Sequence, residues 1–174
     1  MKNAIAASVL VALTAAAAVA QKPAPPPSRF SFKVPDGWTD KSGEGRAYFT
    51  LAVDEKEHLA MQAKVQPGGT PVSPQFVANY IADAQKSVAK ILGGAQLKAL
   101  DARNTTIDGA SAVRFLFELP APPQAEDPQP TRQLQFYVPV GDQHAIITFT
   151  APAKSYAKYE ALFNKTAGAT VIRK

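Results

Sequence analysis

The stretch IDGASAVRFLFEL, residues 107–119, decides the fold of this chain. Its Asp108-Gly109 pair is typical of a two-residue hairpin turn, and the residues after it alternate between apolar and polar. The apolar positions are Val113, Phe115, Phe117 and Leu119, with Arg114 and Glu118 between them. Because alternate side chains of a strand point to opposite faces, the stretch predicts the second arm of a β-hairpin.

The segments on either side extend this hairpin into a four-strand meander. Residues 97–107 predict its first arm, and residues 134–138 and 145–150 predict two more strands. The connection PAPPQAEDPQPT, residues 120–131, holds five prolines. Proline cannot donate a backbone hydrogen bond, so this segment is expected to be a stiff, exposed loop.

Strands and a helix are predicted before the meander, and a second helix after it. Residues 30–34, 47–53 and 59–65 alternate like strands, whereas residues 74–92 repeat their apolar positions every three to four residues. A second helix is predicted over residues 153–167, followed by a short strand at 170–172. This order predicts an α+β fold built on a mostly antiparallel sheet of about six or seven strands.

Strand parity predicts one apolar and one polar face for this sheet. The core is expected to contain Phe30, Phe32, Phe49, Leu51, Phe115, Phe117, Phe136 and Phe149, with Leu134 and Val138 on the same face as the last four. The polar face is expected to carry Tyr48, Thr50, Gln62, Lys64, Arg114, Glu118, Gln133, Gln135, Tyr137 and Thr148. A solvated face is the simpler interpretation of that pattern.

The N-terminus has the features of an export signal. Lys2 is followed by an apolar stretch that ends in Ala18-Val19-Ala20, the small-x-small pattern that signal peptidase cuts. We therefore expect residues 1–20 to be a signal peptide, 21–28 a proline-rich linker and 29–174 one domain. The mature protein would start near Gln21 in the periplasm or outside the cell. The alternative is an uncleaved membrane anchor.

Composition narrows the possible chemistry. The 174 residues carry a net charge of +5 and no cysteine, which excludes disulfides, thiolate nucleophiles and cysteine-ligated zinc. Lysine and arginine are scattered along the chain, so nucleic-acid binding is not expected. His58 and His144 are isolated and predicted to be solvated. His144 with Asp142 provides only two metal ligands, so we predict no metal site, no cofactor and no catalytic residue.

The predicted polar face is the candidate site for a partner. Tyrosine and arginine are enriched at binding hot spots, and the 120–131 loop joins two of the strands concerned. The candidate partner-binding residues are Tyr48, Lys64, Arg114, Gln133, Gln135, Tyr137 and Trp38. For Trp38, packing at the edge of the core is a simpler interpretation than contact with a partner.

Both ends of the domain resemble the PsbP-like superfamily, which includes PsbP and DcrB-like bacterial envelope proteins. The resemblance is carried by FKVPDGW at 32–38 with a strand near Tyr48, and by Gly141, IITFTAP at 146–152, Tyr156 and Leu162-Phe163. It covers about residues 29–172. It implies a curved antiparallel sheet flanked by two helices and a largely non-enzymatic, accessory or binding role. The chain lacks the lipid-anchoring cysteine of some bacterial members, and its proline-rich loop is an elaboration.

Three functions follow as hypotheses. The first is an exported, non-catalytic accessory or binding protein of the periplasm or cell envelope. Its partner would be an envelope protein or a small ligand, and it would not stay inserted in the membrane after cleavage. The second is a periplasmic hydrolase or metal-dependent enzyme. The third is a structural protein tethered to the membrane by an uncleaved N-terminus.

Overall fold

A computed structural model describes residues 28–43, 46–53, 57–121 and 128–173 of the chain. The predicted signal peptide, nearly all of the predicted linker and the centre of the proline-rich loop lie outside these ranges. No helix within the described ranges is long and apolar enough to cross a membrane.

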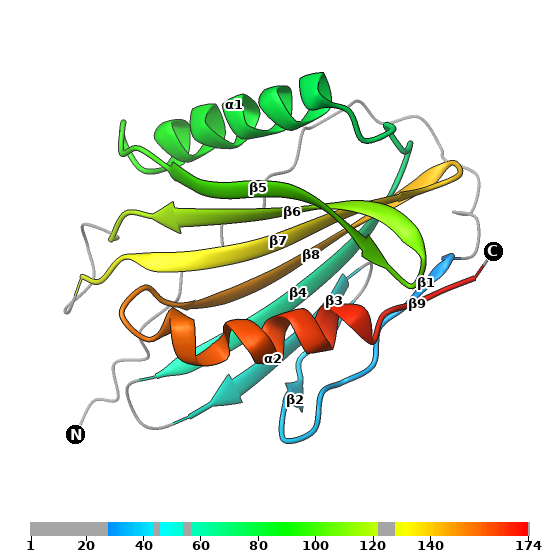
Figure 1. Ribbon diagram of the computed structural model, residues 1–174. Helices are drawn as coiled ribbons and strands as arrows, with labels where there is room; N and C mark the ends of the chain where they lie inside the picture. Colours follow the sequence, from blue (N-terminus) through cyan, green and yellow to red (C-terminus); the bar gives the residue numbers. More distant parts are fainter. Residues whose placement is uncertain (1–27, 44–45, 54–56, 122–127, 174) are drawn as a thin grey trace.

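Over the described residues, the architecture is a seven-stranded antiparallel sheet with two helices (Figure 1). In chain order its strands are β2 (Thr39–Asp40), β3 (Arg46–Ala52), β4 (His58–Pro67), β5 (Lys98–Ile107), β6 (Ala110–Leu119), β7 (Thr131–Val140) and β8 (Gln143–Pro152). They are arranged side by side as β2-β3-β4-β8-β7-β6-β5. A separate pair joins β1 (Phe30–Ser31) to β9 (Val171–Ile172) near the two ends of the domain. The predicted α+β fold class and the four-strand meander are confirmed.

The helices are α1 (Pro74–Ile91) and α2 (Tyr156–Gly168). Helix α1 begins as its sequence dictates: the Ser73 hydroxyl accepts a hydrogen bond from the backbone N–H of Phe76, and Pro74 occupies the first turn. It ends before Gly93 and Gly94, which both have positive φ. Helix α2 starts three residues later than predicted, because Pro152 still belongs to β8 and a turn follows it.

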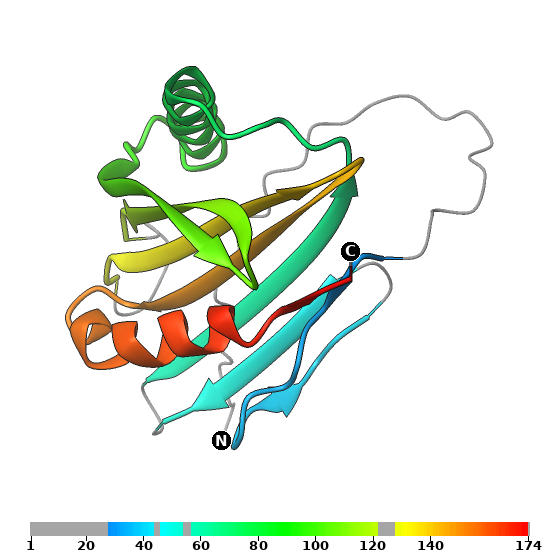
Figure 2. The ribbon, with the colours of Figure 1, turned by 45° about the vertical axis from the view of Figure 1, so that its right-hand side comes forward.

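The two helices pack on opposite faces of the twisted sheet (Figure 2). The core beneath α2 is built mainly from β3, β4, β7 and β8, and includes Phe49, Met61, Phe136, Phe149 and, from α2 itself, Phe163. The core beneath α1 is built mainly on β6, and includes Ala84, Val88, Val113, Phe115 and Phe117. The sheet therefore has two apolar faces at its centre rather than one.

The predicted grouping of faces is wrong for strand β6. Phe115 lies opposite Gln135 in the register, so its side chain shares the α1 face with that residue. Arg114 lies opposite Phe136, so it shares the α2 face with the residues predicted to be core. Because side chains alternate along a strand, the sequence of one strand shows which of its residues share a face. Which face of β6 continues which face of β7 depends on the offset across the 120–130 connection, and that offset has no local sequence signal.

Two smaller corrections concern the predicted core. Phe32 and Leu51 are half-buried and pack against the α2-side core without being enclosed by it. Trp38 is 7 % exposed and belongs to that same core, as its simpler interpretation predicted.

Candidate functional site

Helix α1 covers only one half of its sheet face. The sheet residues in the core beneath it come from β6, β7 and β8. On β3, β4 and the outer part of β8, the side chains of this face are half-buried or exposed. We call this surface the open face and define it by Arg46, Tyr48, Thr50, Gln62, Lys64 and Thr148. Its residues are neighbours by register: Arg46 with Lys64, and Tyr48 with Gln62 and then Thr148.

A line of polar contacts borders the open face where α1 meets the sheet. The Tyr80 hydroxyl donates to Gln135 Oε1 at 3.1 Å, and Gln135 Nε2 donates to Gln133 Oε1 at 3.2 Å. Burial raises the pKa of Tyr80 above its usual range, and the nearby Tyr137 acts in the same direction, so the hydroxyl remains a donor. Gln135 therefore holds α1 to the sheet, and Gln133 supports Gln135 from the same strand.

Tyr137 also serves the docking of α1. Its hydroxyl accepts from the backbone N–H of Thr70 at 2.9 Å and donates to the Thr70 carbonyl at 3.1 Å. Its ring lies 4.4 Å from that of Phe76. A hollow of about 350 Å³ lies along this flank of the helix. It is lined by Thr70, Ser73, Gln75, Phe76, Asn79, Tyr80 and Asp83.

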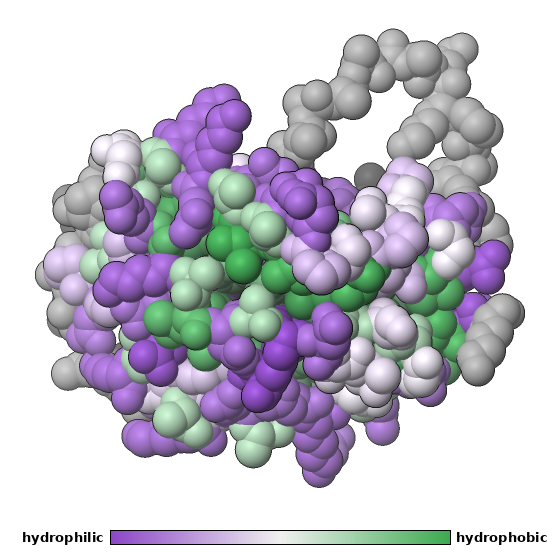
Figure 3. Space-filling view, turned by 45° about the horizontal axis from the view of Figure 1, so that its top comes forward, coloured by the Kyte–Doolittle hydropathy of each residue, from purple (hydrophilic) through white to green (hydrophobic). Residues whose placement is uncertain are grey.

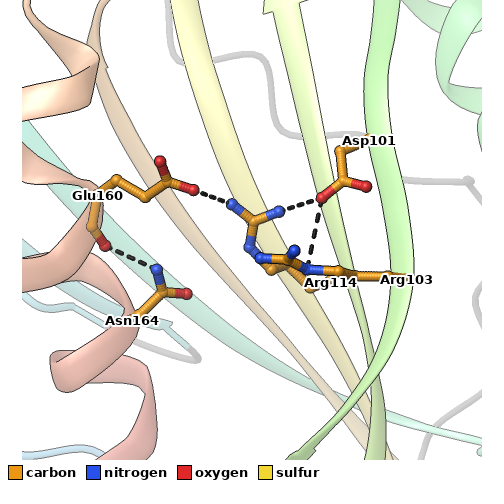
Figure 4. Close-up of polar contacts among 5 residues, drawn as sticks. All are labelled: Asp101, Arg103, Arg114, Glu160 and Asn164. Atoms are coloured by element: carbon orange, nitrogen blue, oxygen red, sulfur yellow. Dashed lines mark hydrogen bonds and ion pairs between the residues drawn. The ribbon is translucent and has the colours of Figure 1, made fainter.

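A charged cluster occupies the opposite face of the sheet (Figure 4). Arg114 is 3 % exposed, and its two terminal nitrogens donate to Asp101 of β5 and Glu160 of α2. Arg103 pairs with the same Asp101 at 3.5 Å, and Asn164 donates to the Glu160 carbonyl at 2.8 Å. This arrangement ties the edge of the sheet to α2.

The same face carries a second set of paired charges. Glu118 contacts Lys98 at 3.1 Å and Arg132 at 3.3 Å, and the Lys98 hydrogen bond is the main cause that lowers the pKa of Glu118. The Arg132 guanidinium lies 5.7 Å from the centre of the Tyr156 ring, and burial raises the pKa of Tyr156 to about 12. Cations on this face are thus neutralised by acids of the chain itself.

The histidines are placed differently from each other. His58 is exposed, as predicted, but His144 is half-buried and not simply solvated. One of its ring nitrogens contacts the Gly68 carbonyl, the other lies 3.2 Å from Gln66 Oε1, and its ring is 5.0 Å from that of Tyr137. His144 therefore links the start of β8 to the end of β4. Across the described ranges, no three side chains of the metal-binding types come together.

The seven candidate residues do not share one surface. Tyr48 and Lys64 lie on the open face. Gln133, Gln135 and Tyr137 are buried against α1, Arg114 is buried on the other face, and Trp38 lies in the α2-side core. The register confirms that Tyr48, Lys64, Gln133, Gln135 and Tyr137 share one side of the sheet. The predicted polar face is wrong at Arg114, which lies on the other side, and it is covered at Gln133, Gln135 and Tyr137, which are buried. The binding role of Tyr48 and Lys64 stays a prediction.

Arg46 is a member of the open face that the sequence analysis missed. The predicted strand began at Ala47, one residue too late to include it. Its signal was present, because Arg46 lies two residues before Tyr48 and therefore has the same parity.

Among the described residues, the large apolar side chains that are exposed are not members of the open face. With the top of the molecule brought forward, apolar side chains form a band among polar ones (Figure 3). The exposed large apolar residues are Val53, Ile91, Leu100 and Val171, which lie just after β3, in α1, in β5 and in β9. None of these four residues is among the six that define the open face, which are polar or charged apart from Tyr48.

Comparisons with known proteins identify the fold. No family model matches the sequence, and no curated protein matches it significantly. Cyanobacterial PsbP (CyanoP) from Synechocystis sp. PCC 6803 is similar in structure, with a TM-score of 0.59 and 14 % identity over 83 % of this chain and 86 % of that one. The chain therefore has the PsbP-like fold, as its sequence resemblance implied.

Two further solved structures share this fold. LpqN of Mycobacterium tuberculosis, described as involved in cell envelope biogenesis, has a TM-score of 0.55 and 13 % identity over 83 % of each chain. PA94 of Pseudomonas aeruginosa, a protein of unknown function described as a putative regulator, has a TM-score of 0.54. It is 19 % identical over 81 % of this chain and 90 % of that one. At such identities the likeness defines the fold alone.

Proposed function

We propose that this protein is an exported accessory protein of the bacterial cell envelope that binds a partner through its open face and carries out no catalysis. One observation carries the proposal: half of the α1-side sheet surface presents accessible polar and aromatic side chains over which no described helix packs. The envelope assignment draws on the N-terminal sequence and on the shared fold with LpqN.

The contacts of Arg114 and His144, two side chains that often take part in catalysis, support a structural role for both. Arg114 is held between two carboxylates, and His144 contacts a carbonyl and an amide oxygen. A general base needs the proton of a nucleophile or a bound water within reach. The described partners of His144 include neither a serine hydroxyl nor a carboxylate, so its contacts fit a structural role.

The binding role is tested by capture from an envelope extract with matched baits. The double variant Tyr48→Ala/Gln62→Ala removes two neighbouring side chains from the open face. The control Asn104→Ala/Thr106→Ala removes two exposed polar side chains from the edge strand β5. Quantitative mass spectrometry should find a protein held by the wild type and the control. We expect the first variant to lower its capture roughly tenfold or more, since hot-spot truncations cost at least about 2 kcal/mol. Equal capture by both variants would remove the open face as the binding surface.

Export is tested on the endogenous chain. The apolar stretch ending at Ala20 leads us to expect a mature N-terminus at or near Gln21 in the soluble envelope fraction. Intact-mass measurement after cell fractionation reads this directly. An intact Met1 in the membrane fraction would instead support the tethered alternative and contradict a freely soluble envelope protein.

A further inference from the structure

We propose, resting on the binding role above, that the open face receives an acidic, extended segment of a partner protein, with a carboxylate held between Arg46 and Lys64. These two cations come from neighbouring strands and are the charged members of the open face. Tyr48, Gln62 and Thr148 extend from them across three strands.

The register places the two cations directly side by side. Arg46 of β3 pairs with Lys64 of β4, so their Cβ atoms lie about 5 Å apart on one face. Like charges in directly opposed positions repel each other, and an anion between them removes that penalty. The Arg46 guanidinium lies 5.6 Å from the centre of the Tyr48 ring, which holds it over the sheet. Arg46 is exposed and Lys64 is half-buried, so both are within reach of a partner.

The two faces of the sheet differ in how their charges are balanced. On the α2 face, Lys98, Arg103, Arg114 and Arg132 each form an ion pair with a carboxylate. Within the described ranges, Arg46 and Lys64 form none. By the register, the acidic residues of the described strands, Asp40, Asp101 and Glu118, all lie on the α2 face. Among the described residues, the open face therefore carries positive charge that no ion pair balances, which favours an anionic partner.

The surroundings of the cation pair fit a peptide better than a lipid surface. Membrane sites that work by charge use clusters of about four to eight cations, and this face has two. Membrane-bound surfaces also insert apolar side chains, yet the exposed large apolar residues lie on other parts of the fold. Gln62 and Thr148 offer amide and hydroxyl groups to the backbone of a bound segment, while arginine binds a carboxylate through two parallel hydrogen bonds.

The test uses the mature full-length protein and a defined probe. A fluorescein-labelled peptide of alternating Glu and Ser is titrated by fluorescence anisotropy, with a Gln/Ser peptide as the neutral control. We expect the acidic peptide to bind, to weaken as NaCl is added, and to shift the backbone amide NMR signals of Arg46, Tyr48 and Lys64. The Gln/Ser peptide should bind at least about tenfold more weakly.

Charge reversal gives the decisive comparison. Arg46→Glu/Lys64→Glu should weaken binding of the acidic peptide at least about tenfold. Lys154→Glu/Lys158→Glu makes the same charge change at two exposed positions, one just before α2 and one within it, and should change binding less than about twofold. Circular dichroism confirms that both variants stay folded. Equal loss in both variants, or NMR shifts confined to other surfaces, would overturn the proposal. Binding to phosphatidylglycerol vesicles through Arg46 and Lys64 without binding to the peptide would also overturn it.

The capture experiment separates this inference from the proposed function. If the captured protein depends on Tyr48 and Gln62 but is insensitive to reversal of Arg46 and Lys64, the acidic segment is refuted and the open face still binds. The opposite result is that the Glu/Ser peptide binds at Arg46 and Lys64 but no captured protein depends on the open face. That result supports recognition of acidic segments by the two cations and refutes the proposed function as an accessory protein that binds through this face.

Discussion

Replacing Arg114 with alanine is expected to lower the free energy of unfolding by about 2–4 kcal/mol. The side chain is nearly fully buried, and its loss removes two charge-assisted hydrogen bonds and leaves a cavity between β6 and α2. This expected loss in the free energy of unfolding is smaller than the loss usually found when one partner of a fully buried ion pair is removed. The reason is that Asp101 and Glu160 are each more than a third exposed and can be rehydrated.

Two further variants serve as controls for this prediction. Arg103→Ala removes a 62 % exposed partner of the same Asp101 and should cost no more than about 1 kcal/mol. Arg114→Met keeps much of the buried volume without the charge and should recover part of the loss. Urea denaturation followed by the fluorescence of Trp38, the lone tryptophan, measures all three variants. A loss below about 1 kcal/mol for Arg114→Ala would show that α2 is held by its apolar face alone.

Replacing Phe149 with alanine is expected to lower the free energy of unfolding by about 3–5 kcal/mol. Phe149 is 0 % exposed at the centre of the sheet. Its ring stacks on Phe163 of α2 at 5.0 Å and meets the edge of Phe136 at 6.3 Å. Truncation leaves a cavity that rigid strand neighbours cannot fill. The same urea titration measures the loss, with Ile91→Ala, at a 51 % exposed helix position, as the control expected within about 0.5 kcal/mol.

A companion variant tests the division into two cores. Phe115→Ala acts beneath α1, where the Phe115 ring stacks on Tyr80 at 4.6 Å, and should expose the amides of α1 to hydrogen exchange. Phe149→Ala should have the corresponding effect on α2. If both variants loosened the same helix, or if Phe149→Ala cost less than about 1 kcal/mol, the packing described above would be contradicted.

The candidate site was only partly predictable from the sequence. Tyr48 and Lys64 were placed on an accessible sheet face, and the structure agrees. Gln133 and Gln135 have the same strand parity but lie beneath α1, because the position of a helix over a sheet depends on packing between distant residues. Polar residue types in a strand do not reveal whether a helix will cover them.

The sequence by itself determined the fold class, the order of the two helices and the six long strands, and the bounds of these elements to within three residues, whereas the short strand β2 was not predicted. These follow from short-range physics: the Asp108-Gly109 turn, the Ser73 cap and the periods of two and 3.6 residues all act within a few positions of the chain. The tertiary structure alone decided which face of β6 joins which core, where Arg114 finds its carboxylates and which half of the sheet stays open. Each of these depends on strand offsets and helix docking across long stretches of chain, and such offsets are set by the sum of many side-chain contacts rather than by any local motif.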